Sequence, residues 1–294
     1  MLRDPMEVAF IMGGMHENES DWRAGGQYIR LSDGLTHWRR EGPPDAIPLV
    51  LVHGATVPAW EFDALVPPLL RAGFQTLRFD LYAHGASDRP AGPYHFERFT
   101  RQLVEIIEST NFPRPSVLLG HSFGAALVAS VAATRPDLAA KVVLVAPMLD
   151  FNSTTGWARV FRYPVIGEFA MHFICVPALI RRRRRRYAGI GKSHLTPRFI
   201  EQVSYSGFGR GLLSMFRTAA LGDQGARYSA LRPIDRDVLV VTGDQDAIIP
   251  AEHVARVRSL LPPHSHCPVP AEHNLLLTHP DSVVNALVDW MREK

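Results

Sequence analysis

Short runs of strand length alternate along the chain with longer segments that have helical spacing. The strand-like runs occupy residues 47–52, 74–79, 117–119, 141–147 and 238–242. Mostly apolar runs of this length are typical of strands covered on both faces. The segments at 60–71 and 96–109 place apolar residues three and four positions apart, which predicts helices. This alternation indicates an α/β fold with a mostly parallel central sheet flanked by helices.

The two ends of the chain add further elements. Residues 27–31 and 35–40 predict two strands joined by a tight turn. Near the C-terminus we expect a helix over 251–261, a short strand over 266–269 and a last helix over 282–291. Residues 1–26 have poor periodicity, and we interpret them as an N-terminal extension.

The alternation of strands and helices stops between residues 150 and 228. This segment is rich in arginine and aromatic residues and predicts helices over 164–186, 197–206 and 210–220. We interpret it as a helical cap inserted over the carboxyl edge of the sheet, where open α/β sheets bind ligands. The predicted domains are the extension, 1–26, a core made of 27–149 and 229–294, and the cap, 150–228.

The charge of the chain is concentrated in one place. Hydrophobic residues at 46% and charged residues at 21% predict a compact globule. Six consecutive arginines begin at Arg181 and end at Arg186, and without them the formal charge of +3 becomes slightly negative. We therefore expect no nucleic-acid partner. The run is either the solvated end of a cap helix or, with the apolar residues before it, a contact with an anionic membrane surface.

The two cysteines, Cys175 and Cys267, lie far apart and form no metal-binding spacing. We expect reduced thiols in a cytoplasmic protein and no metal or organic cofactor; one disulfide between the two cysteines is the alternative. No apolar stretch of the sequence is long enough to span a bilayer.

The sequence G-x-S-x-G at residues 120–124 is the strongest chemical signal. An apolar strand precedes it, and a helix of small residues over 125–133 follows it. A serine on a sharp strand-to-helix turn presents its hydroxyl clear of the backbone, so Ser122 is the candidate nucleophile. The alternative is that Ser122 only caps the following helix.

A serine nucleophile needs a base, and the base works best when a carboxylate orients it. Asp246 lies just beyond the strand at 238–242, and His273 follows the next short strand. Both positions are at strand ends, which meet at one edge of a parallel sheet. Asp244 and Asp150 are the competing acids; His266 and His279 are the competing bases.

The motifs together resemble those of α/β-hydrolases, in particular the cap-bearing esterase and lipase-like group. The resemblance covers the chain from Gln27 to the C-terminus. It rests on His53-Gly54, Asp80, His84-Gly85-x-Ser87-Asp88, Gly120 to Gly124, Gly243-Asp244-x-Asp246 with Pro250, and His273 with His279-Pro280. The chain order Ser, Asp, His is the order of this fold.

The resemblance implies a role for each site residue. Ser122 attacks an acyl carbonyl, His273 acts as general base and then acid, and Asp246 orients His273. The backbone N–H groups of Ala55 and Phe123 form the oxyanion hole.

Four further polar residues are expected to have structural roles. His53 and His121 are expected to support the loop and the serine turn, while Asp80 and His84 organise their own loop.

The resemblance implies a serine hydrolase that cleaves a small-molecule carboxylic ester through an acyl-enzyme, with a hydrophobic acyl pocket under the cap. A carbon–carbon bond hydrolase or an amidase with the same triad is the alternative within the enzymes. A non-catalytic ligand receptor on the same scaffold is the alternative outside them. The sequence indicates neither the natural substrate nor the oligomeric state.

Overall fold

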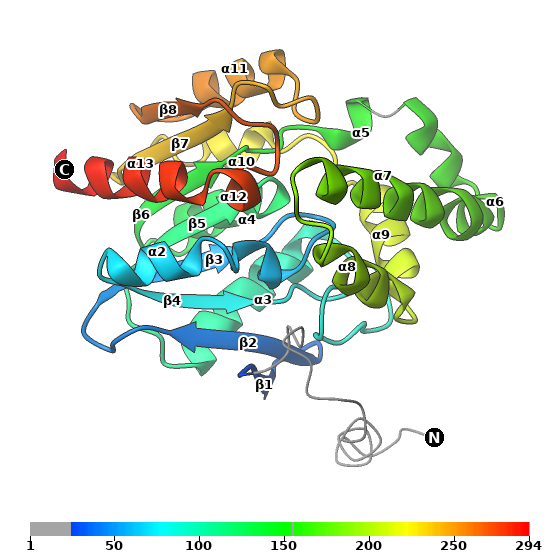
Figure 1. Ribbon diagram of the computed structural model, residues 1–294, viewed down its shortest axis with the longest axis horizontal. Coiled ribbons are helices and arrows are strands. Elements are labelled where there is room, and N and C mark those ends of the chain that lie inside the picture. Colours follow the sequence, from blue (N-terminus) through cyan, green and yellow to red (C-terminus); the bar gives the residue numbers. More distant parts are fainter. Residues whose placement is uncertain (1–24, 155, 294) are drawn as a thin grey trace.

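A computed structural model of the chain describes residues 25–154 and 156–293. Eight strands form one sheet in the order β1-β2-β4-β3-β5-β6-β7-β8 (Figure 1). The pairs β1–β2 and β2–β4 are antiparallel, and every other neighbouring pair is parallel. The predicted mostly parallel sheet is therefore confirmed. Residues 1–24 of the predicted extension lie outside the described residues.

The strands lie close to their predicted positions. They are β1 (Gln27–Arg30), β2 (Leu35–Glu41), β3 (Ile47–Val52), β4 (Phe74–Phe79), β5 (Ser116–His121), β6 (Ala139–Val145), β7 (Val238–Gly243) and β8 (Ser265–Val269). Because successive side chains point to opposite faces, β3 sends Val50 and Val52 into one core cluster and Leu49 and Leu51 into the other.

Helices cover both faces of the sheet, and each face has its own apolar cluster. On one face lie α3 (Phe96–Ser109), α4 (Phe123–Thr134), α10 (Gly225–Ser229) and α11 (Ala251–Leu260). On the other lie α2 (Val66–Arg71), α12 (Leu275–Thr278) and α13 (Pro280–Glu293). The core helices cover the two faces of the sheet and leave the carboxyl ends of the parallel strands uncovered.

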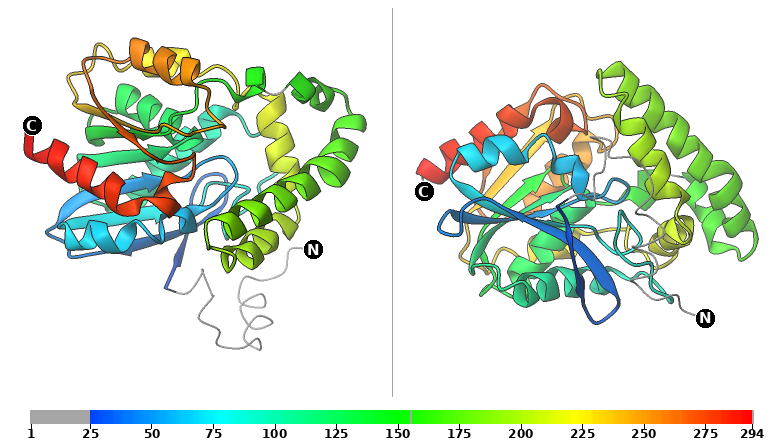
Figure 2. Two further views of the ribbon diagram at one scale, coloured as in Figure 1. Left: turned by 45° about the horizontal axis from the view of Figure 1, so that its top comes forward. Right: turned by 60° about the horizontal axis from the view of Figure 1, so that its bottom comes forward.

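The helices between β6 and α10 lie beyond these carboxyl ends in all the views of Figures 1 and 2. They are α5 (Phe151–Thr154), η2 (Gly156–Arg162), α6 (Ile166–Phe169), η3 (Ala170–Cys175), α7 (Val176–Gly189), α8 (Leu195–Ser204) and α9 (Phe208–Arg217). Their position is that expected of the cap. The boundaries of the cap at 150 and 228 stay predictions.

Two predicted helices are broken into shorter elements. The segment 60–71 consists of η1 (Ala59–Phe62) and α2, which has proline in its first turn. The segment 164–186 contains α6, a π-helical stretch in η3, and α7, which also begins with a proline near its start. Proline has no backbone N–H to donate to the preceding turn, so it fits a first helical turn and interrupts an interior one.

Cys175 and Cys267 are both free, as predicted. No helix in the described part of the chain is both long and apolar enough to cross a membrane. The cytoplasmic location stays a prediction.

Candidate active site

Ser122 stands at the sharp turn between β5 and α4, with φ 54° and ψ −111°. The two motif glycines permit this turn. A Cβ on Gly120 would lie 2.2 Å from the carbonyl oxygen of Gly124, and a Cβ on Gly124 would lie 2.1 Å from that of Val52. Any larger residue would push α4 away from the sheet, which explains both glycines of G-x-S-x-G.

Ser122 occupies the N-cap position of α4, but its hydroxyl makes no capping hydrogen bond to the helix. Its backbone is held instead: its N–H donates to the Val145 carbonyl at 2.9 Å, and its carbonyl accepts from the Met148 N–H at 3.2 Å. The residue is 9% exposed and lines a pocket at the carboxyl edge of the sheet.

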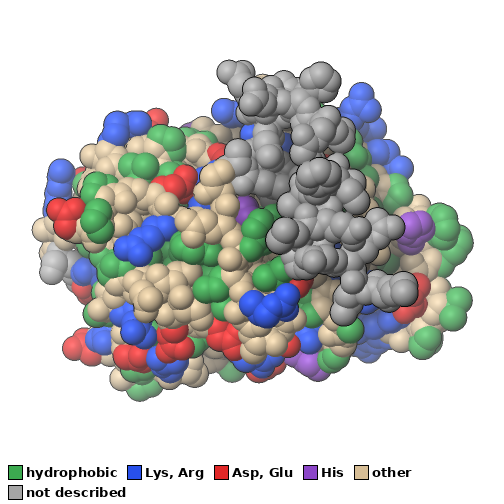
Figure 3. All heavy atoms as spheres, turned by 90° about the horizontal axis from the view of Figure 1, so that it is seen from below, with side chains coloured by type: hydrophobic (Ala, Val, Ile, Leu, Met, Phe, Trp, Pro, Cys, Tyr) green, Lys and Arg blue, Asp and Glu red, His purple; other side chains and the backbone are tan. Residues whose placement is uncertain are grey.

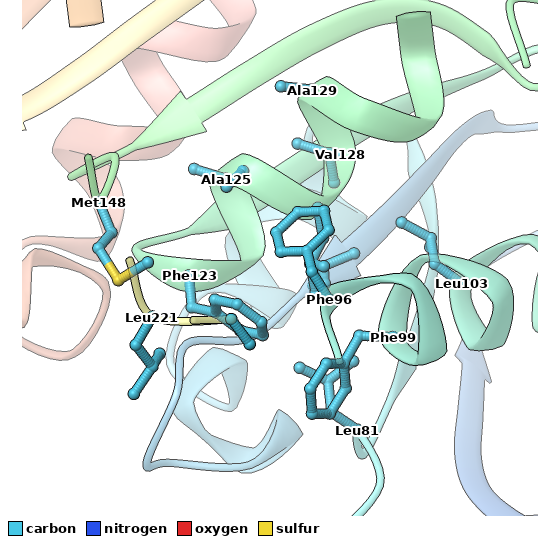
Figure 4. Close-up of a cluster of buried hydrophobic side chains, with 14 of the residues drawn as sticks. Leu81, Phe96, Phe99, Leu103, Phe123, Ala125, Val128, Ala129, Met148 and Leu221 are labelled. Carbon is cyan, nitrogen blue, oxygen red and sulfur yellow. The ribbon is translucent and has the colours of Figure 1, made fainter. Parts of the chain in front are cut away.

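The side chain of Phe123 anchors the start of α4 (Figure 4). Its ring meets Phe96 and Phe99 of α3 edge to face, with centroid distances of 5.8 and 5.3 Å. Phe123 is the first residue of α4, and amides of a first helical turn have no acceptor within the helix. The packing therefore fixes an amide next to Ser122 that is available to a ligand.

The loop after β3 lies directly beside Ser122. A Cβ placed on Gly54 would be 3.4 Å from the Cβ of Ser122. The Ala55 carbonyl accepts a hydrogen bond from His84 Nε2 at 2.8 Å, and the Gly54 carbonyl accepts one from His53 Nδ1 at 2.7 Å. The structure thus uses His53 and His84 as supports of this loop, in agreement with their predicted structural roles.

Asp80 has the organising role that was expected for it. Its buried carboxylate accepts hydrogen bonds from the backbone N–H groups of Ala59 and Ala86, each at 2.9 Å, and from His37 Nδ1 at 2.9 Å. It therefore links the loop after β3 to the loop after β4, away from the pocket that Ser122 lines.

His273 and Asp246 meet at the same edge of the sheet. His273 Nδ1 donates to Asp246 Oδ2 at 2.7 Å, and the two side chains are 6% and 5% exposed. Asp246 Oδ1 accepts the N–H groups of Ile248 and Ile249 at 2.8 and 3.0 Å. Both carboxylate oxygens are engaged, which fixes the imidazole. Ser122 and His273 line one pocket.

The electrostatics suit a base and its orienting carboxylate. Burial lowers the pKa of His273 below its ordinary value, although the hydrogen bond to Asp246 acts in the opposite direction. Burial raises the pKa of Asp246, but the hydrogen bond and charge of His273 outweigh it and leave that pKa lowered. At neutral pH the imidazole is therefore free to accept a proton while the carboxylate stays ionised.

The alternative acids, Asp150 and Asp244, and the alternative bases, His266 and His279, have other hydrogen-bond partners or are exposed. Asp150 accepts a backbone hydrogen bond from the short helix that follows it, and Asp244 is exposed on its turn. His266 pairs with a threonine hydroxyl of β7, and His279 pairs with the hydroxyl of the threonine before it. The structure brings Asp246 and His273 together and places these four outside that pair.

The pocket has a volume of about 570 Å³ and lies between the core and the cap. Most of its lining is apolar and comes from Met148, Phe151, Phe161, Met171, Leu212, Phe216, Leu221 and Ile248. Three arginines of the predicted run, Arg182, Arg183 and Arg186, also line it.

The arginine run is only partly solvated: Arg183 and Arg186 are partly buried, and the other four arginines are exposed. Its interpretation as the solvated end of a cap helix stays a prediction. The run lies inside α7, which continues to Gly189. Residues three or four positions apart are neighbours on a helix surface, and Arg186 follows Arg183 by three positions and Arg182 by four.

Comparison with known proteins places the chain in a family. The model described as "Alpha/beta hydrolase family" matches residues 49–286, most of the chain. The chain belongs to the alpha/beta hydrolase family. The non-heme chloroperoxidase of Streptomyces lividans is 26% identical over 270 residues, 86% of this chain and 95% of that protein. The (E)-2-((N-methylformamido)methylene)succinate hydrolase of Acinetobacter baylyi is 24% identical, over 90% of this chain and 97% of that protein. The crystal structure of a bromoperoxidase from Bacillus anthracis has a TM-score of 0.76 at 18% identity, covering 91% of this chain and 99% of that one.

These alpha/beta hydrolase relatives carry names that stand for different reactions. The shared fold fixes where a site lies and leaves its chemistry to the side chains and the pocket. Among the described residues of this alpha/beta hydrolase, no cluster of three or more His, Cys, Asp or Glu side chains is arranged to hold a metal ion.

One buried pair was missed at the sequence level. Glu61 Oε1 accepts the N–H of Gly54 at 3.0 Å and lies 3.1 Å from His121 Nδ1. His121 Nε2 donates to the carbonyl of His273 at 3.1 Å. A carboxylate and a carbonyl only accept, so this geometry suits a His121 ring that donates from both nitrogens. Burial lowers the pKa of His121, but the Glu61 carboxylate outweighs it and raises that pKa.

The Glu61–His121 pair connects three separate parts of this alpha/beta hydrolase site. It joins the loop at Gly54, the end of β5 before Ser122, and the backbone of His273. The prediction that His121 supports the serine turn agrees with this geometry. The only sequence signal for Glu61 is a carboxylate between the bulky residues Trp60 and Phe62, and it gains meaning only once the three parts are placed together.

Proposed function

We propose that the protein is a serine hydrolase that cleaves carboxylic esters, with Ser122 as nucleophile, His273 as base and Asp246 as orienting acid. One observation carries the proposal. The 2.7 Å hydrogen bond between His273 and Asp246 lies at the edge of a largely apolar pocket that Ser122 also lines. A histidine oriented by a carboxylate, beside a serine whose hydroxyl is not used for helix capping, is the arrangement that activates a hydroxyl.

The proposed reaction has two half-reactions. The Ser122 oxygen attacks the ester carbonyl while His273 Nε2 takes its proton, and the oxyanion receives hydrogen bonds from the amides of Ala55 and Phe123. The intermediate collapses when His273 returns the proton to the leaving alcohol, which gives the acyl-enzyme. Water then adds to the acyl carbon with His273 as base, and the acid leaves as Ser122 regains its proton.

Labelling by a fluorophosphonate probe tests the activated serine directly. We expect covalent labelling at Ser122, found by peptide mass spectrometry, and its loss in Ser122→Ala. Ser130→Ala is the matched control, because this serine lies on the same helix α4 and does not line the pocket. Absence of labelling in the folded wild type, with tight binding of small apolar ligands, would instead favour a receptor.

Acyl selectivity follows from the pocket lining. A hydrophobic acyl group is the proposed occupant, because aromatic and aliphatic side chains from the cap and core form most of the wall. Matched p-nitrophenyl esters and p-nitroanilides of acetyl, butyryl and octanoyl groups separate an esterase from an amidase and rank acyl length.

We also propose that the cap contacts an anionic membrane. Five side chains, Val165, Ile166, Phe169, Phe173 and Ile174, form what we call the cap apolar patch, and each is between 56% and 78% exposed. Arg181, Arg184 and Arg185 are exposed on α7, which continues the same helical segment. Figure 3 shows hydrophobic and basic side chains at the end of the molecule that carries α6. Apolar residues next to exposed arginines suit an interfacial helix.

Sedimentation with liposomes tests this contact. The double variant Arg184→Gln/Arg185→Gln should weaken binding to vesicles containing phosphatidylglycerol, because each arginine near such a surface contributes about 1 kcal/mol. Phe169→Ser/Phe173→Ser should weaken it by removing apolar burial. Arg71→Gln is the control, because Arg71 is an exposed arginine on α2, outside the cap. Equal binding by all variants would contradict the proposal.

A further inference from the structure

The wall of the Ser122 pocket that α7 supplies is cationic beside the loop after β3. Arg183 donates from one terminal nitrogen to Thr56 Oγ1 at 2.8 Å and from the other to Asn274 Oδ1 at 3.3 Å. Thr56 follows Ala55, whose amide is proposed to bind the oxyanion. Asn274 follows His273, and Arg183 lines the same pocket as Ser122 and His273.

The charge of Arg183 has no counter-ion in the described part of the chain. Its hydrogen-bond partners are a hydroxyl and an amide, and its guanidinium also lies over the ring of Phe199 at 5.7 Å. Arg186 forms an ion pair with Glu272, and the pocket carboxylate Glu61 is already bound to His121. A half-buried guanidinium with only neutral partners is costly unless a ligand supplies the opposite charge.

We propose that Arg183 is the centre of an anion subsite, with Arg182 and Arg186 on the same face of α7, and that the substrate carries a carboxylate or phosphate group. This inference takes the ester reaction at Ser122 from the proposed function, but the binding of the anion does not depend on it. A guanidinium presents several N–H donors in a plane, which matches two oxygens of a carboxylate or phosphate.

The position of the subsite restricts the substrate further. The two residues that hold Arg183 are chain neighbours of Ala55 and His273, so the anionic group must lie only a few bonds from the ester carbonyl. The apolar lining then receives the uncharged remainder of the molecule. Half-esters of short dicarboxylic acids and esters with a nearby phosphate have this combination.

Arg183 could instead serve only to hold the cap on the core through Thr56 and Asn274. The anion subsite and this structural role predict different effects of substitution on substrate selectivity. The test compares p-nitrophenyl hydrogen glutarate with its methyl-capped neutral counterpart, and the readout is the ratio of their kcat/KM values. Loss of a clamp would lower both values together. Loss of an anion subsite would lower the ratio.

We expect Arg183→Gln to lower this ratio about 10- to 100-fold, the effect of removing charge-assisted hydrogen bonds. Arg183→Lys should recover part of it, because the charge remains and the planar donor pair is lost. The control Arg162→Gln changes an exposed cap arginine that does not line this pocket and should leave the ratio unchanged. An unchanged ratio in Arg183→Gln would overturn the proposal.

Calorimetry with the Ser122→Ala protein separates the subsite from the ester reaction. Monomethyl glutarate and propyl phosphate are titrated as the carboxylate and phosphate probes, with dimethyl glutarate as the neutral control. Tighter binding of either anion than of the neutral compound, lost on adding Arg183→Gln, supports the subsite even if wild-type protein hydrolyses no ester. Anion binding that Arg183→Gln does not weaken overturns the subsite even if the ester reaction is confirmed.

Discussion

Ser122→Ala is expected to lower ester turnover by about 10⁴- to 10⁶-fold, the range seen when the nucleophile of a triad is removed. The hydroxyl is the only group that the substitution deletes. It makes no capping hydrogen bond, and the backbone contacts of Ser122 to Val145 and Met148 do not involve the side chain. The variant should therefore fold like the wild type, with the alanine in the same positive-φ conformation.

The measurement is kcat/KM for a p-nitrophenyl ester, together with thermal unfolding followed by circular dichroism. Ser130→Ala on the same helix should retain turnover. A melting temperature equal to that of the wild type ties the loss of turnover to chemistry. Turnover within about tenfold of the wild type would remove Ser122 from the reaction and with it the proposed mechanism.

The core was predictable because its strands are short apolar runs bounded by prolines and glycines, which interrupt strands. For β3 and β4 the predicted and observed limits agree, since Pro43, Pro44 and Gly73 stop pairing just before each strand. The cap was predicted less well. Its helices depend on contacts with the core. Within the predicted helix 164–186, the sequence pattern does not indicate the π-helical stretch Ala170–Cys175 that separates α6 from α7.

The candidate site shows the same division. Ser122, Asp246 and His273 were found from sequence because each follows a strand, and parallel strands end at one edge of the sheet. The Glu61–His121 pair requires the meeting of three segments, which no local pattern encodes. Six identical arginines carry no periodicity, so the sequence gives no sign that Arg183 faces the pocket while Arg184 faces solvent.

Asp246→Asn is expected to lower kcat/KM about 10³- to 10⁴-fold, close to the effect of the same change in other triads. Asn keeps an oxygen for the N–H groups of Ile248 and Ile249. Its NH₂ then faces His273 Nδ1, which favours the tautomer with the proton on Nε2. In that tautomer Nε2 has no free lone pair to accept the proton of Ser122, so His273 cannot act as the base.

The pH dependence provides a second, independent readout of Asp246→Asn. His273 must be neutral to act, so activity is present above its pKa and is lost as the pH falls through it. Burial already lowers this pKa from 6.5, and Asp246 acts to raise it. Removing the carboxylate charge should therefore lower it further and move the acid limb of kcat/KM to lower pH. The matched control is Asp244→Asn, which changes an exposed carboxylate on the same loop. It should leave both kcat/KM and the acid limb of its pH profile unchanged.

Two results would show that Asp246 is not the partner of His273. One is an acid limb that moves to higher pH in Asp246→Asn, and the other is a larger loss of kcat/KM in Asp244→Asn than in Asp246→Asn.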